Sequence, residues 1–159
     1  MWFPGNASYT ESAMHEVRTD IEIEATPERV WSILLDFPSH PDWNPFVRSI
    51  KGVAKVGDRL TVFIQPQGGK GMTFHPAILT VIPNAELRWR GRFFLPGIFD
   101  GEHYFQINQI APRHVRFVQG EKFSGVLVPF AKSRLDGGTK AGFIAMNQAL
   151  KSRAESTTP

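Results

Sequence analysis

The stretch VRTDIEIEATPERVW (residues 17–31) places a strand next to the start of a helix. From Val17 to Ala25, apolar or small residues alternate strictly with charged ones, which is the pattern of a strand with one buried face. Thr26 then offers a helix N-cap, and Pro27 is a favoured first helical residue. We therefore predict a half-buried strand that leads directly into an amphipathic helix.

The segment after this helix start supports the same interpretation. Apolar residues between Val30 and Phe37 form a stripe at helical spacing, and Pro38 is expected to end the helix. Residues 39–46, which lie between prolines, favour a second short helical turn. Two short helices are therefore expected after the first strand.

Six further strands are expected, because short segments are separated by turn-forming Gly, Pro, Asn and Asp residues. Their expected ranges are 47–53, 58–65, 72–82, 86–94, 99–110 and 114–123. The short connections favour an antiparallel meander. A long amphipathic helical stretch over 126–154 then closes the chain. Gly137 and Gly138 interrupt it, and since each Gly costs about 1 kcal/mol in a helix interior, we expect a kink or break there.

The length of 159 residues fits one domain, which we place at residues 14–155. Residues 1–13 show neither helical nor strand periodicity and are expected to form a flexible lead. The absence of Cys excludes a disulfide scaffold. No apolar run reaches the roughly 18 residues of a membrane helix, and the N-terminus lacks the pattern of a signal peptide. We expect a cytoplasmic protein with no integral membrane segment.

Charge is distributed unevenly: residues 1–47 carry a net charge of −6 and residues 48–159 one of +9. A basic segment of this kind can bind nucleic acid or an anionic membrane. The basic residues are spread singly along the strands, however, and are not clustered among exposed aromatic residues. We therefore expect a solvated basic outer face and no nucleic-acid partner.

Charge also indicates which side of each strand faces the core. The segment 86–94 carries three Arg residues that cannot face a core without partners, so Trp89 points inward. The same reasoning places three polar residues on the otherwise apolar inner faces of the next two strands: His103, Gln119 and Glu121.

The pairing of these two strands permits two registers. His103 stands opposite Glu121 in one and opposite Gln119 in the other, so the imidazole and the carboxylate are direct or diagonal neighbours in both. A buried carboxylate needs a partner, and the imidazole can supply one. Three roles stay open for the pair: a structural contact that fixes register, a polar spot that orients a ligand's carbonyl or hydroxyl group, and proton transfer.

Other chemistries find little support. The five His residues show no spacing typical of metal ligands, so no metal site is expected. Residues 68–71 (GGKG) lack the full spacing of a phosphate-binding loop and are interpreted as a hairpin tip. No cofactor is expected.

Six motifs, in this order and spacing, carry a resemblance to a known superfamily. They are ATPERVW (25–31), PDWNPF (41–46), LRWRG (87–91), FDGEHYF (99–105), EKFSG (121–125) and GFIAMN (142–147). Over roughly residues 17–154, the chain resembles the START-like (SRPBCC) superfamily, in particular its bacterial polyketide cyclase/dehydrase-like branch.

The resemblance implies an α+β helix-grip fold. In this fold a curved, seven-stranded antiparallel sheet wraps around a long C-terminal helix, and two short helices after the first strand close one end. A ligand cavity lies between the sheet and the long helix. His103 and Glu121 match inner-face polar positions of this branch. Residues 136–138 depart from it, because the branch usually continues as helix there.

We therefore expect a protein that binds or carries a hydrophobic small molecule, such as a lipid, an aromatic or a polyketide-like compound. The residues expected to contact it are Trp43, Phe46, Trp89, His103, Phe105, Phe117, Gln119, Glu121, Phe143 and Met146. Since the superfamily includes both binders and enzymes, one alternative is an aromatase/cyclase- or dehydratase-like enzyme that uses His103 and Glu121 as acid and base. Another is a protein-interaction or accessory module with Arg88, Arg90 and Arg92 on its surface.

Overall fold

Strands occupy the middle of the chain, and helices follow the first strand and the last. The structure, a computed structural model, describes residues 14–93 and 95–156, so the expected flexible lead at 1–13 lies outside the described residues. The elements in chain order are β1 (Met14–Ile23), α1 (Pro27–Leu35), a 3₁₀ turn (Phe37–Ser39), α2 (His40–Trp43), β2 (Val47–Lys51), β3 (Thr61–Ile64), β4 (Met72–Phe74), β5 (Ala77–Ile82), β6 (Glu86–Phe93), β7 (Phe99–Ala111), β8 (His114–Ser124), α3 (Val128–Arg134), a π-helical turn (Leu135–Thr139) and α4 (Lys140–Glu155). None of these helices is both long enough and apolar enough to cross a membrane.

The junction of β1 and α1 has the chemistry that the sequence predicts. The Thr26 side chain accepts a hydrogen bond from the backbone N–H of Arg29 at 3.2 Å, so Thr26 caps α1 and Pro27 is its first residue. Val30 and Leu34 are buried on the inner side of the helix. The helix therefore packs its apolar stripe against the core.

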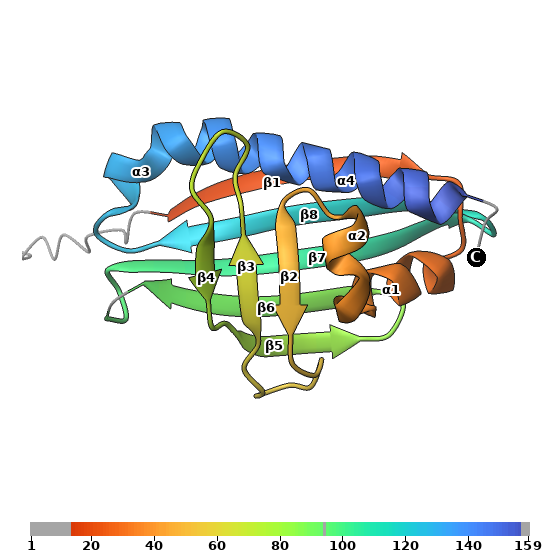
Figure 1. The fold of residues 1–159 in the computed structure, drawn as a ribbon, viewed down its shortest axis with the longest axis horizontal. Helices are drawn as coiled ribbons and strands as arrows, with labels where there is room; N and C mark the ends of the chain where they lie inside the picture. The colour runs from red at the N-terminus through yellow and green to blue at the C-terminus, as the bar shows by residue number, and fades with distance from the viewer. Residues whose placement is uncertain (1–13, 94, 157–159) are drawn as a thin grey trace, which may run out of the picture.

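The larger sheet has five strands in the order β1-β8-β7-β6-β5, all antiparallel. Strands β5 to β8 form the expected meander, and β1 pairs with the last of them. Figure 1 shows α3 and α4 running along β1, while β2, β3 and β4 cross the longer strands of the larger sheet. The α+β helix-grip arrangement, with a curved antiparallel sheet and a long C-terminal helix, is thus confirmed.

The number of strands differs from the prediction: the described residues form eight strands in two sheets, not seven in one. The segment 72–82, expected to be one strand, is divided into β4 and β5 at His75 and Pro76. A proline has no N–H to donate to a sheet ladder, so Pro76 ends the pairing there. Strands β2, β3 and β4 form a separate three-stranded sheet.

The two sheets remain joined at this bend. The Leu60 N–H donates to the Pro76 carbonyl, and the Ile78 N–H donates to the Asp58 carbonyl, both at 2.9 Å. The backbone before β3 therefore still pairs with the backbone around Pro76. The smaller sheet is folded over the larger one and encloses space between them.

The C-terminal helical stretch is continuous but irregular. Gly137 and Gly138, where we expected a kink or break, lie in a π-helical turn, and the residues that flank the turn keep right-handed helical angles. The glycines thus widen one turn of the helix without ending it.

Burial confirms most of the inner faces predicted from charge: Trp89, His103 and Phe105 are at most 4% exposed. Tyr104, between His103 and Phe105, lies on the outer face of β7, yet its side chain is only 4% exposed. Its ring lies under the Arg88 guanidinium, 5.0 Å from the ring centre. Its hydroxyl donates to Glu16 Oε1 at 2.5 Å. Burial, and then this hydrogen bond, raise the pKa of Tyr104 to about 12.

Val118 on the outer face of β8 is buried as well, at 1% exposed. It lies in the middle of a central strand, opposite Asp20 on β1 and Gln106 on β7. Side chains on both neighbouring strands can therefore cover it. A residue on the outer face of a sheet can therefore be buried when it lies near the centre of that sheet.

Candidate functional site

A cavity of about 220 Å³ lies between the two sheets and the C-terminal helical stretch. Its wall is mainly apolar. The lining residues are Phe46, Val62, Ile64, Pro66, Met72, Phe74, Pro76, Trp89, Gly91, Phe99, Gly101, His103, Glu121, Phe123, Ala131, Arg134, Leu135 and Thr139. The smaller sheet, the larger sheet and the π-helical turn each supply part of this wall.

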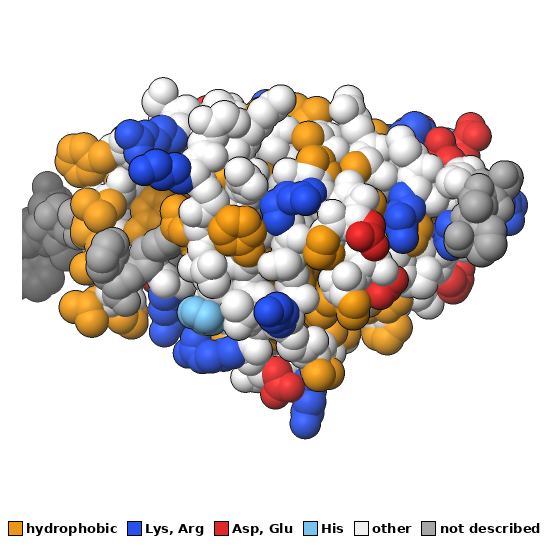
Figure 2. Space-filling view, viewed as in Figure 1, with side chains coloured by type: hydrophobic (Ala, Val, Ile, Leu, Met, Phe, Trp, Pro, Cys, Tyr) orange, Lys and Arg blue, Asp and Glu red, His pale blue; other side chains and the backbone are white. Residues whose placement is uncertain are grey.

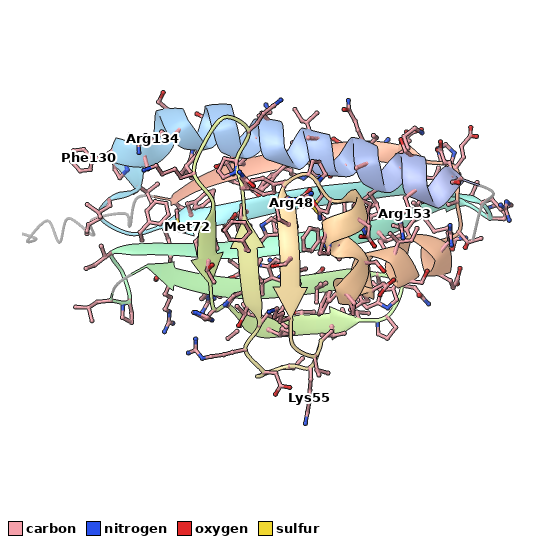
Figure 3. All side chains as sticks on the ribbon, viewed as in Figure 1. Arg48, Lys55, Met72, Phe130, Arg134 and Arg153 are labelled. Carbon is pink, nitrogen blue, oxygen red and sulfur yellow. The ribbon has the colours of Figure 1, made fainter. Side chains whose placement is uncertain are left out.

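The cavity has a mouth and a closed end. Met72 on β4 and Arg134 on α3 line it and are exposed, and Figure 3 shows both on the side where the β3–β4 hairpin approaches α3. Trp89 and His103 line it and are buried. The cavity therefore opens between the hairpin and α3 and closes on the larger sheet.

The closed end carries the polar residues singled out from the sequence. The strand register places His103 directly opposite Glu121, which is one of the two predicted registers. The distance from His103 Nδ1 to Glu121 Oε2 is 3.2 Å. On the other side of the ring, His103 Nε2 lies 3.2 Å from Gln119 Nε2. The three side chains thus form a chain of contacts along β7 and β8.

This arrangement defines where the imidazole proton lies. The Gln119 amide donates to Nε2, so the ring proton is on Nδ1, from which it is donated to the Glu121 carboxylate. Both ring nitrogens of His103 therefore have protein partners. Glu121, whose side chain is 19% exposed, is the member of the pair with an oxygen to spare for a ligand.

The second oxygen of Glu121 rests against the backbone of Gly101. A Cβ at position 101 would collide with Glu121 Oε1. The glycine therefore makes room for the carboxylate beside the cavity, and both residues belong to its wall.

Aromatic rings hold His103 in place. The Trp89 ring stacks on the imidazole at 5.3 Å between centroids, Phe105 lies at 4.5 Å, and Phe143 meets it edge-on at 5.1 Å. Phe143 in turn packs on Phe46, whose ring lies so close to Gly142 that a Cβ there would collide with it. The polar corner is thus set in a rigid apolar frame.

Of the ten residues expected to contact a ligand, four line the cavity: Phe46, Trp89, His103 and Glu121. The other members of the set lie elsewhere. Phe105, Phe117, Gln119, Phe143 and Met146 are at most 1% exposed in the core behind the wall. Trp43 lies on α2, where its ring packs on His40 at 4.9 Å. Ligand contact by these six stays a prediction.

Several lining residues were not anticipated from the sequence. Val62 and Ile64 are alternate residues of β3, and Phe99 and Phe123 lie on the inner faces of β7 and β8. The alternation of side chains along a strand could therefore have predicted that these four residues face the cavity. Leu135, in the π-helical turn, shares helical spacing with Phe143 and Met146, so helical spacing was an available signal for it.

A second polar group lies deeper, between β1, β8 and α4. Asn147 Nδ2 donates to Thr19 Oγ1 at 2.9 Å, and the Thr19 hydroxyl donates to the backbone carbonyl of Gln119 at 3.2 Å. The side-chain oxygens of Gln119 and Asn147 are buried and have no hydrogen-bond partner among the described residues. This group lies outside the cavity wall and ties the long helix to the sheet.

Neither a metal centre nor a free basic surface is supported by the described residues. Within residues 14–93 and 95–156, no three His, Asp or Glu residues are grouped as metal ligands would be. On the outer face, Arg88 contacts Glu86 and Glu102 at 2.8 Å each, and Arg90 contacts Glu102 at 2.9 Å. These arginines are therefore neutralised by carboxylates on their own sheet.

Solved structures with the same fold were found. A START superfamily protein from Mycobacterium smegmatis is 21% identical, with a TM-score of 0.71, covering 89% of this chain and 97% of that chain. The Zhui aromatase/cyclase from Streptomyces sp. R1128 is 13% identical, with a TM-score of 0.72, covering 90% and 94%. Norcoclaurine synthase from Thalictrum flavum, in complex with dopamine and hydroxybenzaldehyde, is 14% identical, with a TM-score of 0.68, covering 96% and 92%. At these identities the similarity establishes the fold.

Comparison at the level of sequence gives the family. No curated protein sequence matches the chain significantly. The family model described as "Polyketide cyclase / dehydrase and lipid transport" matches residues 14–155, nearly the whole of the described chain. This protein is therefore a member of that polyketide cyclase/dehydrase and lipid-transport family.

Proposed function

We propose that this protein binds a small, mainly apolar molecule that carries one polar group. The observation behind the proposal is the composition of the cavity: an apolar wall with His103 and Glu121 at its closed end. Ligand sites are typically apolar pockets with a few polar groups that fix orientation. A ligand hydroxyl or amine would donate to Glu121, while its apolar part packs on Trp89.

The size of the cavity limits the ligand. Its volume of about 220 Å³ lies below the roughly 300–1,000 Å³ of pockets that take drug-sized ligands. We therefore favour a one- or two-ring aromatic compound or a short acyl chain over a large polycyclic product. The expected cytoplasmic location is part of this proposal and rests on the sequence alone.

The proposal is tested with a ligand panel measured by thermal shift. The panel contains one- and two-ring phenols, the same rings without the hydroxyl group, and short fatty acids. At least one hydroxylated compound should raise the melting temperature of the wild type. Ala131→Trp, which places a large ring at the mouth of the cavity, should abolish the effect. The idea fails if no compound raises the melting temperature, or if Ala131→Trp responds like the wild type.

A second candidate function is proton transfer to or from the bound molecule. It is supported by the contact of His103 with Glu121 at the cavity wall. Against it, both nitrogens of His103 are occupied by protein groups, so Glu121 would have to be the group that meets the substrate. The two neighbours with enzyme names support catalysis only by analogy of fold.

The enzymatic alternative predicts exchange of a carbon-bound hydrogen next to a ligand carbonyl. A base removes this proton and a solvent deuteron returns to the carbon, which NMR can follow in D₂O. Glu121→Gln should stop the exchange while binding persists. Exchange at the same rate in the wild type, the variant and buffer would leave binding as the function.

A further inference from the structure

One end of the molecule presents four large apolar side chains to solvent. Phe130 is 86% exposed, Leu95 and Val126 are each 68% exposed, and Leu127 is 43% exposed. We call these four residues the apolar tip. Leu95 belongs to the connection between β6 and β7, Val126 and Leu127 to the loop before α3, and Phe130 to α3 itself.

Backbone hydrogen bonds hold these segments together. The Val126 N–H donates to the Gly97 carbonyl at 3.2 Å, and the Leu127 N–H donates to the Ile98 carbonyl at 3.1 Å. The Phe130 N–H donates to the Leu127 carbonyl at 3.1 Å, which ties the first turn of α3 to the same loop. The apolar tip therefore brings together segments that are far apart in sequence.

Unpaired positive charge borders this surface. Helix α3 carries Lys132 and Arg134 in its last turn and has no acidic residue. Neither side chain forms an ion pair or hydrogen bond with any residue of the described ranges. Figure 2 shows hydrophobic side chains gathered at this end of the molecule, with Lys and Arg side chains beside them, and Figure 3 places Phe130 and Arg134 there.

The apolar tip also adjoins the mouth of the cavity. Ala131 and Arg134, which follow Phe130 on α3, line the cavity, and so does Phe99, at the start of β7. A surface that covers the tip would therefore meet the opening through which a ligand enters.

We propose that the apolar tip docks on a lipid bilayer that contains anionic lipids. Interfacial binding of this kind combines apolar side chains that enter the headgroup region with Lys and Arg that contact anionic lipids. Phe130 and its three neighbours supply the first part, and Lys132 and Arg134 the second. Docking brings the cavity mouth to the membrane, so that an apolar ligand passes between the two without crossing water. This last consequence rests on the proposed function; the docking itself does not.

The positive charge beside the apolar tip favours a lipid bilayer, and not a second copy of the chain, as the surface that covers the tip. Two tips that met face to face would bring the Lys132 and Arg134 side chains of both copies together, and like charges repel. Anionic headgroups complement the same side chains. The tip also lies at one end of the long axis of the described fold (Figure 1), an end that can face an extended surface.

The test is co-sedimentation of the full chain with vesicles of phosphatidylcholine, with and without phosphatidylserine. No ligand is added. The wild type should partition onto the vesicles that contain phosphatidylserine, and salt should weaken the binding. Phe130→Ser should lower the partition coefficient roughly tenfold or more, since burial of a Phe side chain is lost. Lys132→Ala should lower it by roughly fivefold, as expected for one interfacial cation.

A matched control is Ile110→Ser, because Ile110 is 51% exposed at the far end of β7. Its partitioning should equal that of the wild type. A wild type that stays in the supernatant with both vesicles overturns the proposal, and so does equal loss in Phe130→Ser and Ile110→Ser. A dimer in analytical ultracentrifugation that Phe130→Ser dissociates would instead make the tip an interface between two copies.

The docking proposal and the proposed ligand-binding function can be tested independently of each other. Phe130 does not line the cavity, so Phe130→Ser should bind a panel compound in solution as the wild type does. Loss of vesicle binding with intact ligand binding would remove only the docking proposal. Vesicle binding without any ligand binding would remove only the proposed function.

Discussion

His103 and Glu121 stand directly opposite each other on β7 and β8, and His103 Nδ1 lies 3.2 Å from Glu121 Oε2. The contact is set by the strand pairing and not by the flexibility of the side chains. It joins a fully buried imidazole to a carboxylate that reaches the cavity. The pair therefore serves both the fold, as a satisfied buried contact, and the site, as its polar corner.

Gly101→Ala should displace the Glu121 carboxylate, because the added Cβ collides with Oε1. We expect a loss of about 1–3 kcal/mol in the free energy of unfolding, as for other overpacked sites. Gly91→Ala is the matched control: Gly91 pairs with Gly101, also lines the cavity, and a Cβ there has no other atom within 4 Å. Denaturant unfolding should separate the two variants, and equal stabilities would show that the carboxylate is not held against Gly101.

Glu121→Gln should change ligand selectivity. A hydrogen bond to a charged group contributes about 1.5–3 kcal/mol, so a hydroxylated ligand should lose roughly tenfold or more in affinity. The same ring without the hydroxyl should bind the variant as it binds the wild type. Calorimetric titration of both compounds gives the comparison. A parallel loss for the two compounds would mean that Glu121 does not contact the polar group.

The same substitution should have opposite effects at two glycines of the C-terminal helical stretch. Gly142→Ala pushes a Cβ into the Phe46 ring and should lower the free energy of unfolding by about 1–3 kcal/mol. Gly137→Ala meets nothing within 4 Å and should raise it by up to about 1 kcal/mol, through helix propensity. Thermal unfolding of both variants tests this, and destabilisation by Gly137→Ala would show that the π-helical turn needs its glycine.

The free energy of unfolding should fall as the pH drops below 6.5, because of His40. Burial lowers the pKa of His40 from its ordinary value of 6.5. The neutral ring donates from Nε2 to the Leu34 carbonyl at 2.9 Å and accepts from Asn44 Nδ2 at 3.1 Å. Between the lowered pKa and 6.5, the unfolded chain binds more protons than the folded one, so acid favours unfolding.

Urea unfolding at several pH values between about 7.5 and 5 measures this effect, and His40→Gln should flatten the slope. Glu102, whose pKa is lowered from 4.5 by Arg90 and Arg88 against the opposing effect of burial, contributes only at lower pH. An unchanged slope in His40→Gln would assign the effect to another group.

Much of the site was predictable because charge alternation reveals strand faces. The alternation of side chains alone placed His103 and Glu121 on the same face and left two possible registers. In the structure the register is the one in which His103 stands directly opposite Glu121. The alternation does not show, however, where along the strands the larger sheet separates from the smaller sheet and the helical stretch to leave a cavity. Phe105 and Phe117 share the inner faces but pack into the core, because the cavity forms only farther along the strands.

The misassigned parts of the fold depend on backbone chemistry at single positions. Pro76 divides an expected strand, so the smaller sheet and its lining residue Met72 could not be placed from periodicity. The glycines at 137 and 138 signalled an irregularity, but not that the helix would widen instead of breaking. The apolar tip gave no periodic signal, since its residues come from separate segments that meet only in the folded chain.

The most direct test of ligand binding in this cavity is NMR of the tryptophan indole groups during titration with a panel compound. Trp89 lines the cavity, whereas Trp31 and Trp43 do not, so the last two serve as internal controls. Trp→Phe variants assign the signals. We predict that the Trp89 indole resonance shifts and saturates together with the calorimetric binding curve. A shift of Trp31 or Trp43 without any change at Trp89 would contradict binding in this cavity.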